Sequence, residues 1–415
     1  MMSPPPPDAF RRLPPTPEGG QAPSIVVIVP EMLPVPPVLG GAVELWVHEL
    51  TSRLATPGRR VAVISRPAGV AGANGVEYIN LPWTGPERLL DRLKQRLGQA
   101  NPLRYIAKLL SVWSYARRAA RASEGFDILY LHNEPNALLL LPRRAGQRIV
   151  LHMHNDHLSI KLLRAIYRQA LAKADLVLFV SEFIRRKASA AFPEYAHRFK
   201  TVLNATDPAG PGADTAGTDP LELPQLQSGG PRLLYVGRLV RIKGVHVLIE
   251  AFARVRARFP QAQLVIAGSA FFGGAVKTPY EAQLTRLAAR MGPAVVFTGY
   301  LPQSSLRTLY RACDVVVVPS IWAEPFGLVV LEAMASGTCV VASAVGGLPE
   351  VIDDRRTGLL VKAGDPVALA DAVIEVLADN SLKRSLEQAA ADTLAHKFTW
   401  DRLVGEVEAL MQRSS

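Results

Sequence analysis

Short apolar runs alternate with longer segments of helical spacing along most of the chain. Runs that are apolar throughout and rich in Val, Ile and Leu predict strands buried on both faces of a sheet. The first half is predicted to have helices between its strands, notably at 42–55 and 162–172. Its predicted strands are 25–29, 61–65, 128–132, 149–152 and 176–180.

The same alternation restarts after residues 206–231, a segment rich in Gly, Pro, Asp and Thr that predicts a linker. Strand–helix alternation on both sides of a linker predicts two doubly wound α/β domains, at 24–205 and 232–395. Their ligand crevices are expected at the carboxyl ends of the strands, facing each other across a cleft. The predicted strands are 233–236, 263–267, 295–298, 315–319, 339–342 and 359–361, and the predicted helices are 244–258, 279–291, 303–312, 328–336, 366–378 and 382–397.

Length and composition agree with two globular domains. The 415 residues exceed the roughly 250–300 that one hydrophobic core supports, and 49% of them are hydrophobic. Residues 1–23 are Pro-rich without periodicity and predict a disordered tail. The two cysteines, Cys313 and Cys339, exclude a disulfide framework, a four-cysteine zinc site and an iron–sulfur cluster. With no apolar stretch of membrane-spanning length and no leader pattern, we expect a cytoplasmic protein.

The net charge of +11 is confined to one half of the chain. Residues 1–210 hold 27 Lys and Arg against 16 Asp and Glu, whereas the remainder holds 20 of each. An excess placed in this way indicates an anionic partner that faces only the first half.

Residues 88–121 hold nine of these basic residues against a single acid, Asp91, with leucines interleaved. The pattern is typical of a basic amphipathic helix that lies on an anionic membrane surface. The alternative is a pair of domain helices whose arginines are simply solvated. Nucleic acid is not an expected partner, because no recognition motif accompanies the charge.

Two cations stand at a predicted strand-to-helix turn in the second half. Gly237 permits a tight turn after the strand, and Arg238 and Lys243 flank the start of the next helix. Cations at a helix N-terminus form a clamp suited to a pyrophosphate. The alternative is that both are solvated surface side chains.

Two carboxylates, Glu324 and Glu332, bracket another predicted helix start. Phe326-Gly327 opens this helix, and backbone N–H groups near Gly327 and Leu328 can receive a phosphate there, which leaves the carboxylates to bind hydroxyl groups. The alternative is one helix-terminal charge and one solvated glutamate. A third turn, Gly346-Gly347, is expected to allow close backbone approach to a ligand.

The first half offers a glycine pair and a string of histidines. Gly40-Gly41 precedes the first predicted helix, but neither a spaced dinucleotide-binding glycine motif nor a P-loop is present. The string His152, His154, Asp156 and His157 follows a strand and has the ligand types of a binuclear metal hydrolase. Its position in the middle of a doubly wound pattern argues against that interpretation.

Taken together, the Gly237–Gly244 segment, the Glu324/Glu332 pair and the Gly346–Glu350 segment resemble the donor site of retaining family 4 glycosyltransferases. The resemblance covers most of residues 24–400 and implies a GT-B fold with two Rossmann-like domains. The segments 33–36 and 269–273 are similar to the spore-coat-type branch. The family's C-terminal helix implies that residues 396–415 cross back to the first domain.

The resemblance also implies a role for each matching residue. Arg238 and Lys243 would bind the donor diphosphate, Glu332 the ribose, and Glu324 the transferred sugar, beside the amides of residues 326–328. Gly40 and Gly41 would close over the donor, and His154 would bind a sugar hydroxyl, with no metal required.

The expected activity is retaining transfer of a hexose or amino-sugar from a nucleotide-sugar to an acceptor on the basic first domain. The surplus charge indicates an anionic or lipid-linked acceptor in cell-envelope or glycan synthesis, with peripheral membrane association through residues 88–121. The alternatives are a sugar-nucleotide 2-epimerase, a non-catalytic sugar-nucleotide-binding protein and the binuclear metal hydrolase.

Overall fold

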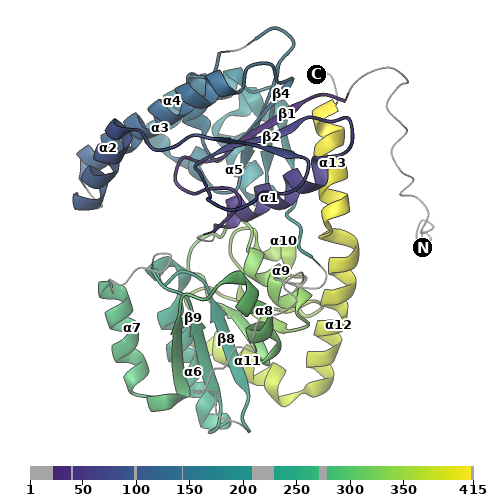
Figure 1. Ribbon diagram of the computed structural model, residues 1–415. Helices are drawn as coiled ribbons and strands as arrows, with labels where there is room; N and C mark the ends of the chain where they lie inside the picture. The colour runs from purple at the N-terminus through teal and green to yellow at the C-terminus, as the bar shows by residue number, and fades with distance from the viewer. Residues whose placement is uncertain are drawn as a thin grey trace, which may run out of the picture.

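The computed structural model describes residues 22–38, 41–97, 101–142, 144–207, 229–270 and 278–412. Gly40, nearly all of the predicted tail, most of the predicted linker and residues 271–273 of the spore-coat-like segment lie outside these ranges. The described chain forms two α/β bodies, each built on its own parallel sheet (Figure 1).

The first sheet has seven parallel strands in the order β3-β2-β1-β4-β5-β6-β7. Central strands such as β1 and β4 are buried at every position, as expected for a sheet covered on both faces. The strands are β1 (Ile25–Ile28), β2 (Val61–Ser65), β3 (Val76–Asn80), β4 (Ile128–His132), β5 (Arg148–Met153), β6 (Leu176–Phe179) and β7 (Phe199–Thr201).

The second sheet has six parallel strands in the order β10-β9-β8-β11-β12-β13. In both sheets the first strand lies in the interior and the strand order reverses beside it, which is the doubly wound arrangement. The expected pair of Rossmann-like domains is therefore confirmed. The strands are β8 (Arg232–Val236), β9 (Gln263–Ala267), β10 (Val295–Gly299), β11 (Val315–Val318), β12 (Cys339–Ser343) and β13 (Leu359–Val361).

Helices connect successive strands and cover the sheets. Several begin with side-chain caps, such as the Thr84 capping box before α2 and Asp365 before α11. The helices are α1 (Ala42–Leu54), α2 (Gly85–Arg96), α3 (Pro102–Ala122), α4 (Arg164–Lys173), α5 (Glu182–Ala191), α6 (Val245–Arg258), α7 (Pro279–Ala289), α8 (Gln303–Arg311), α9 (Leu328–Ala335), α10 (Leu348–Val351), α11 (Pro366–Ala378), α12 (Asn380–Lys397) and α13 (Trp400–Gln412).

Helix α13 lies against the first domain, although it follows the second in sequence (Figure 1). Its side chains Trp400, Leu403 and Val407 join the cluster that contains Trp46 and Leu50 of α1. Helix α13, which follows α12, thus links the two domains through apolar packing.

Within the basic stretch 88–121, α2 ends at Arg96 and α3 begins at Pro102. Asn101 caps α3 through a hydrogen bond from Leu103 N–H to its side chain at 2.9 Å, and Pro102 starts the helix. Among the described residues, no helix has both the length and the apolar character needed to cross a membrane.

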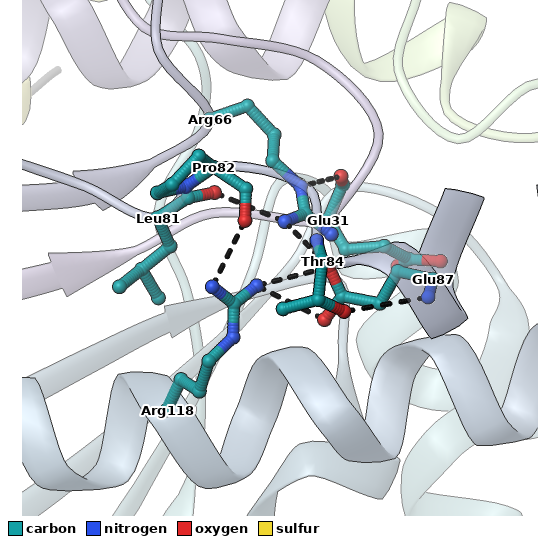
Figure 2. Close-up of polar contacts among 7 residues, drawn as sticks. All are labelled: Glu31, Arg66, Leu81, Pro82, Thr84, Glu87 and Arg118. Atoms are coloured by element: carbon teal, nitrogen blue, oxygen red, sulfur yellow. Dashed lines mark hydrogen bonds and ion pairs between the residues drawn. The ribbon is translucent and has the colours of Figure 1, made fainter.

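A buried ion-pair network fixes these helices to the first sheet (Figure 2). The Glu87 carboxylate is fully buried and accepts hydrogen bonds from Arg66 at 3.0 Å and from Arg118 at 2.9 Å. Arg66 also donates to the backbone carbonyls of Glu31 and Leu81. The network thus joins the loops after β1 and β3 to the start of α2 and to the end of α3.

Candidate active site

The cleft between the domains holds two adjoining cavities of about 380 Å³ each. Both lie at the carboxyl ends of parallel strands, where an α/β sheet binds its ligands. One is lined by Gly41 and Leu45 of the first domain and by Arg238 and Glu332 of the second. The other is lined by residues that include His154, Asn204, Lys243 and Glu324.

Lys243 and Glu324 form an ion pair in the second cavity. Lys243 Nζ lies 2.6 Å from Glu324 Oε1, and the Ser320 hydroxyl donates to the same oxygen. The Glu324 side chain is only 6% exposed, so the ammonium and the hydroxyl hold this carboxylate in one place. No hydrogen-bond partner of the other carboxylate oxygen, Oε2, lies among the described residues.

Glu332 lies in the middle of α9 and lines the first cavity. Its carboxylate accepts hydrogen bonds from the Tyr310 hydroxyl at 2.8 Å and from Gln303 Nε2 at 3.2 Å. Burial raises the pKa of Glu332, and the hydrogen bonds from Tyr310 and Gln303 partly offset this effect. Tyr310 and Gln303 were not predicted as site residues, because only the tertiary structure brings α8 against α9.

Arg238 lines both cavities. Its side chain is exposed and has no hydrogen-bond or ion-pair partner in the part of the chain that the structure describes. Its backbone carbonyl accepts a hydrogen bond from Tyr235 at 2.8 Å, which fixes the turn after β8. An exposed guanidinium held at its base is suited to binding an anion in the cleft.

The N-terminus of α9, at Gly327 and Leu328, lines the cleft. Gly327 is its N-cap at φ +104°, and no side chain caps the helix there. Phe326 is only 2% exposed and its ring lies 6.1 Å from that of Phe398, so this residue contributes packing beside the cleft. A helix N-terminus without a side-chain cap, such as that at Gly327 and Leu328, is suited to binding a phosphate or another anion.

The Gly346-Gly347 turn approaches protein backbone rather than an open ligand site. A Cβ on Gly346 would lie 2.1 Å from the Glu324 carbonyl oxygen, and the Gly347 N–H donates to that oxygen at 2.7 Å. The close backbone approach seen at this turn is to Glu324 of the same chain, and approach to a ligand stays a prediction. These glycines position the loop that carries Glu324.

A stack of three histidines lies on the first-domain side of the cleft, with His132 and His152 buried and His154 half-buried. His132 and His152 are paired neighbours on β4 and β5, and His154 follows two residues later. His132 Nδ1 lies 2.9 Å from His154 Nε2, and Tyr130 OH lies 2.7 Å from His152 Nδ1. Burial lowers the pKa of all three imidazoles, that of His154 to about 3, so they are neutral.

The metal-hydrolase interpretation is not favoured by this arrangement. Asp156 turns away to pair with Lys187 and Ser159, while His132, which the string omits, completes the cluster. One ring nitrogen from each of His132, His152 and His154 lies within 4.8 Å of the others, but neither Asp156 nor His157 belongs to this group, so the string does not form the two-metal ligand set among the described residues.

Direct contacts hold the two domains together beside the site. The Glu350 carboxylate accepts hydrogen bonds from the backbone N–H groups of Glu182 at 2.7 Å and Phe183 at 2.6 Å. These N–H groups open helix α5 of the first domain, so Glu350 caps that helix from the other domain. Ser181 also donates to the Pro325 carbonyl at 2.5 Å, next to Glu324.

Two family models match the chain, one in each domain. The model described as "Glycosyltransferase Family 4" matches residues 40–209, and the model described as "Glycosyl transferases group 1" matches residues 223–393. The chain carries a family 4 domain followed by a group 1 glycosyl transferase domain. Between them the two matches include every predicted site residue.

Named relatives extend this similarity over the whole chain. Spore coat protein SA of Bacillus subtilis is 25% identical over 94% of this chain and 99% of its own. The putative glycosyltransferase YtcC of the same organism is 28% identical over 94% and 91%. Because these two are about equally similar, membership of the spore-coat branch stays a prediction.

Solved structures agree with the fold. HepE of Anabaena, solved in complex with UDP and with UDP-glucose, superposes with TM-scores of 0.68 and 0.67 at 22% and 21% identity. The UDP complex covers 94% of this chain and 99% of HepE. The expected GT-B glycosyltransferase fold is confirmed.

Proposed function

We propose that the protein is a retaining glycosyltransferase that moves a hexose or amino-sugar from a nucleotide-sugar donor to an acceptor held by its basic first domain. The observation that carries this proposal is the cleft lined by Lys243, Glu324 and Glu332. Arg238, which has no ion-pair partner among the described residues, lines the same cleft. The complexes of HepE with UDP and UDP-glucose support a nucleotide-sugar as the donor class.

Each group has a chemical role in this proposal. Arg238, Lys243 and the free N–H groups at the start of α9 bind the donor diphosphate, where negative charge grows as the glycosidic bond breaks. Glu332 accepts from ribose hydroxyls, and Glu324 accepts from hydroxyls of the transferred sugar. The acceptor hydroxyl forms the new bond to the anomeric carbon as the sugar–phosphate bond breaks, and its proton passes to the departing nucleoside diphosphate.

The neutral His154 is suited to binding a hydroxyl of the donor sugar. Its hydrogen bond to His132 occupies Nε2, so Nδ1 is the atom left to serve a ligand in the cleft. We propose no metal in this step, since fixed cations and helix amides already face the leaving group. Full activity in chelator supports that part, and loss of activity restored by a divalent cation overturns it.

The test of the proposal is release of nucleoside diphosphate from a panel of UDP-, GDP- and ADP-sugars. Product analysis by NMR then reports whether the anomeric configuration of the donor is kept. An inverted product contradicts the retaining mechanism while leaving transfer itself intact. Conversion of the donor to its 2-epimer, or binding without turnover, favours the two alternatives of epimerase and sugar-nucleotide-binding protein.

A further inference from the structure

Helices α2 and α3 form an arm that projects from the side of the first domain (Figure 1). The root of the arm is held by the Arg66–Glu87–Arg118 network and by the buried side chains Tyr115 and Ala119. Its outer part has no comparable cover from the described residues.

The outer face of α3 carries a continuous apolar stripe. Leu103, Ile106, Leu110 and Trp113 are spaced by three or four residues, which places them on one face of a helix. Each of them is between 45% and 55% exposed. On α2, Leu89 and Leu93 are likewise exposed one turn apart. Large exposed apolar side chains gathered in this way mark a surface that contacts a partner or a membrane.

Unpaired cations border the stripe. The exposed arginines of the arm that have no ion-pair partner among the described residues are Arg88, Arg92, Arg96, Arg117 and Arg121. Where α3 meets the body, a groove of about 410 Å³ is lined by Trp113, Arg117, Arg121 and Arg144, with Glu124 as its acid. Its size and charge are suited to a phosphate headgroup.

We infer that the arm docks onto an anionic phospholipid surface, with the apolar stripe in the headgroup boundary and the arginines against lipid phosphates. Charge complementarity selects this occupant. A second copy of the chain would bring two strongly basic faces together, whereas an anionic bilayer supplies both apolar depth and negative charge. This partner goes beyond the proposed transfer reaction, and its binding can be measured without donor or acceptor.

The arm begins next to the cleft. Glu31 and Glu134 follow the carboxyl ends of β1 and β4. Burial raises the pKa of both carboxyls, that of Glu134 to about 8, and Lys108 of α3 lies close enough to oppose this shift. Those strand ends flank the point where the strand order of the first sheet reverses. A membrane bound by the arm would therefore lie near the side of the cleft assigned to the acceptor.

Vesicle co-sedimentation of the full chain tests the inference. Wild-type protein is expected to pellet with vesicles of phosphatidylcholine and phosphatidylglycerol at about 0.05 M salt, and to be released at about 0.5 M, where charges are screened. Vesicles of phosphatidylcholine alone should retain little protein. Equal retention on both vesicle types at low salt, or none on either, overturns the inference.

Matched variants separate the arm from bulk charge. Arg88→Ser/Arg92→Ser/Arg96→Ser should weaken binding about tenfold or more. The control Arg286→Ser/Arg290→Ser/Arg311→Ser removes the same charge from exposed sites on the second domain and should bind like the wild type. Leu103→Ser/Ile106→Ser/Leu110→Ser should also lose binding. Equal vesicle binding by the arm and control variants contradicts the inference. So does a wild-type protein that binds no vesicles but forms a dimer, if the Leu103→Ser/Ile106→Ser/Leu110→Ser variant is a monomer.

Discussion

At the scale of single residues, the cleft gathers charged groups whose partners are fixed before any ligand binds. Glu324 is held by Lys243 and Ser320, and Glu332 by Tyr310 and Gln303. Such fixed partners keep reacting groups oriented and reduce the reorganisation needed during transfer.

Glu324→Ala and Lys243→Ala should each lower transfer by about 100-fold or more while leaving the fold intact, because each removes a group placed against the donor. Steady-state release of nucleoside diphosphate measures the loss, and thermal unfolding checks the fold. Lys161→Ala, an exposed lysine outside the cleft, is the control and should keep full activity. Wild-type rates in both site variants would refute their assigned roles.

The buried histidines predict a pH dependence of stability. The folded protein holds His132, His152 and His154 neutral, with their pKa values lowered by burial, whereas in the unfolded chain they protonate near pH 6.5. Below that pH the unfolded chain binds more protons, so stability falls as the pH drops. Each histidine contributes a slope of about 1.4 kcal/mol per pH unit.

Urea unfolding between pH 7 and pH 5 measures this slope. His152→Phe should make it shallower than in the wild type, because one buried imidazole no longer opposes folding at low pH. His197→Gln, at an exposed site, should leave the slope unchanged. A wild-type slope equal to that of His152→Phe would show that these imidazoles are not held neutral.

At the scale of helices and strands, most of the fold could be predicted from apolar runs. The expected strands at 61–65, 128–132, 263–267 and 359–361 have the observed bounds. Strands β3 and β7 were missed because both are edge strands and only partly buried, so they lack a continuous apolar run.

The site was predictable only in part, for a related reason. Glycines, cations and carboxylates at strand ends stand out along the sequence. In contrast, His132 and Tyr310 contact site residues that are distant in sequence. Ser320 contacts the nearby Glu324, but it follows an ordinary apolar strand. No local pattern distinguishes such residues from core positions.

The cap across the domain interface gives a prediction at this scale. Glu350→Ala should destabilise the protein by about 1–2 kcal/mol, because it leaves the first N–H groups of α5 without their acceptor. It should also open the cleft, seen as a larger radius of gyration in solution scattering. Glu375→Ala removes an exposed ion pair with Arg355 and should change stability by about 0.5 kcal/mol or less. Matching effects of the two variants would contradict the capping role.

At the scale of the whole molecule, α13 ties the two domains together. Trp400 is buried against α1, with its ring 6.2 Å from that of Trp46. Trp400→Ala should destabilise the protein by about 3 kcal/mol, measured by urea unfolding. Trp113→Ala removes an exposed tryptophan and should cost about 0.5 kcal/mol or less. Equal losses from both would show that α13 contributes no more than surface packing.

The charge of +11 takes on a more specific meaning in the folded molecule. Residues 211–415 hold as many acidic as basic residues and supply Arg238 and Lys243 to the site. Residues 1–210 carry the whole excess, and the arm in this half holds arginines without ion-pair partners among the described residues. In the proposed function, donor binding therefore depends on a few placed cations, and the surplus charge is assigned to another partner.

Turnover of a nucleotide-sugar is the most direct test of the central claim. Wild-type protein incubated with UDP-, GDP- and ADP-sugars is predicted to bind one of them in calorimetry and to release its nucleoside diphosphate, faster when an acceptor is added. The Arg238→Ala/Lys243→Ala variant is predicted to lose both. Failure of the folded wild-type protein to bind any of the three donor classes would contradict the account.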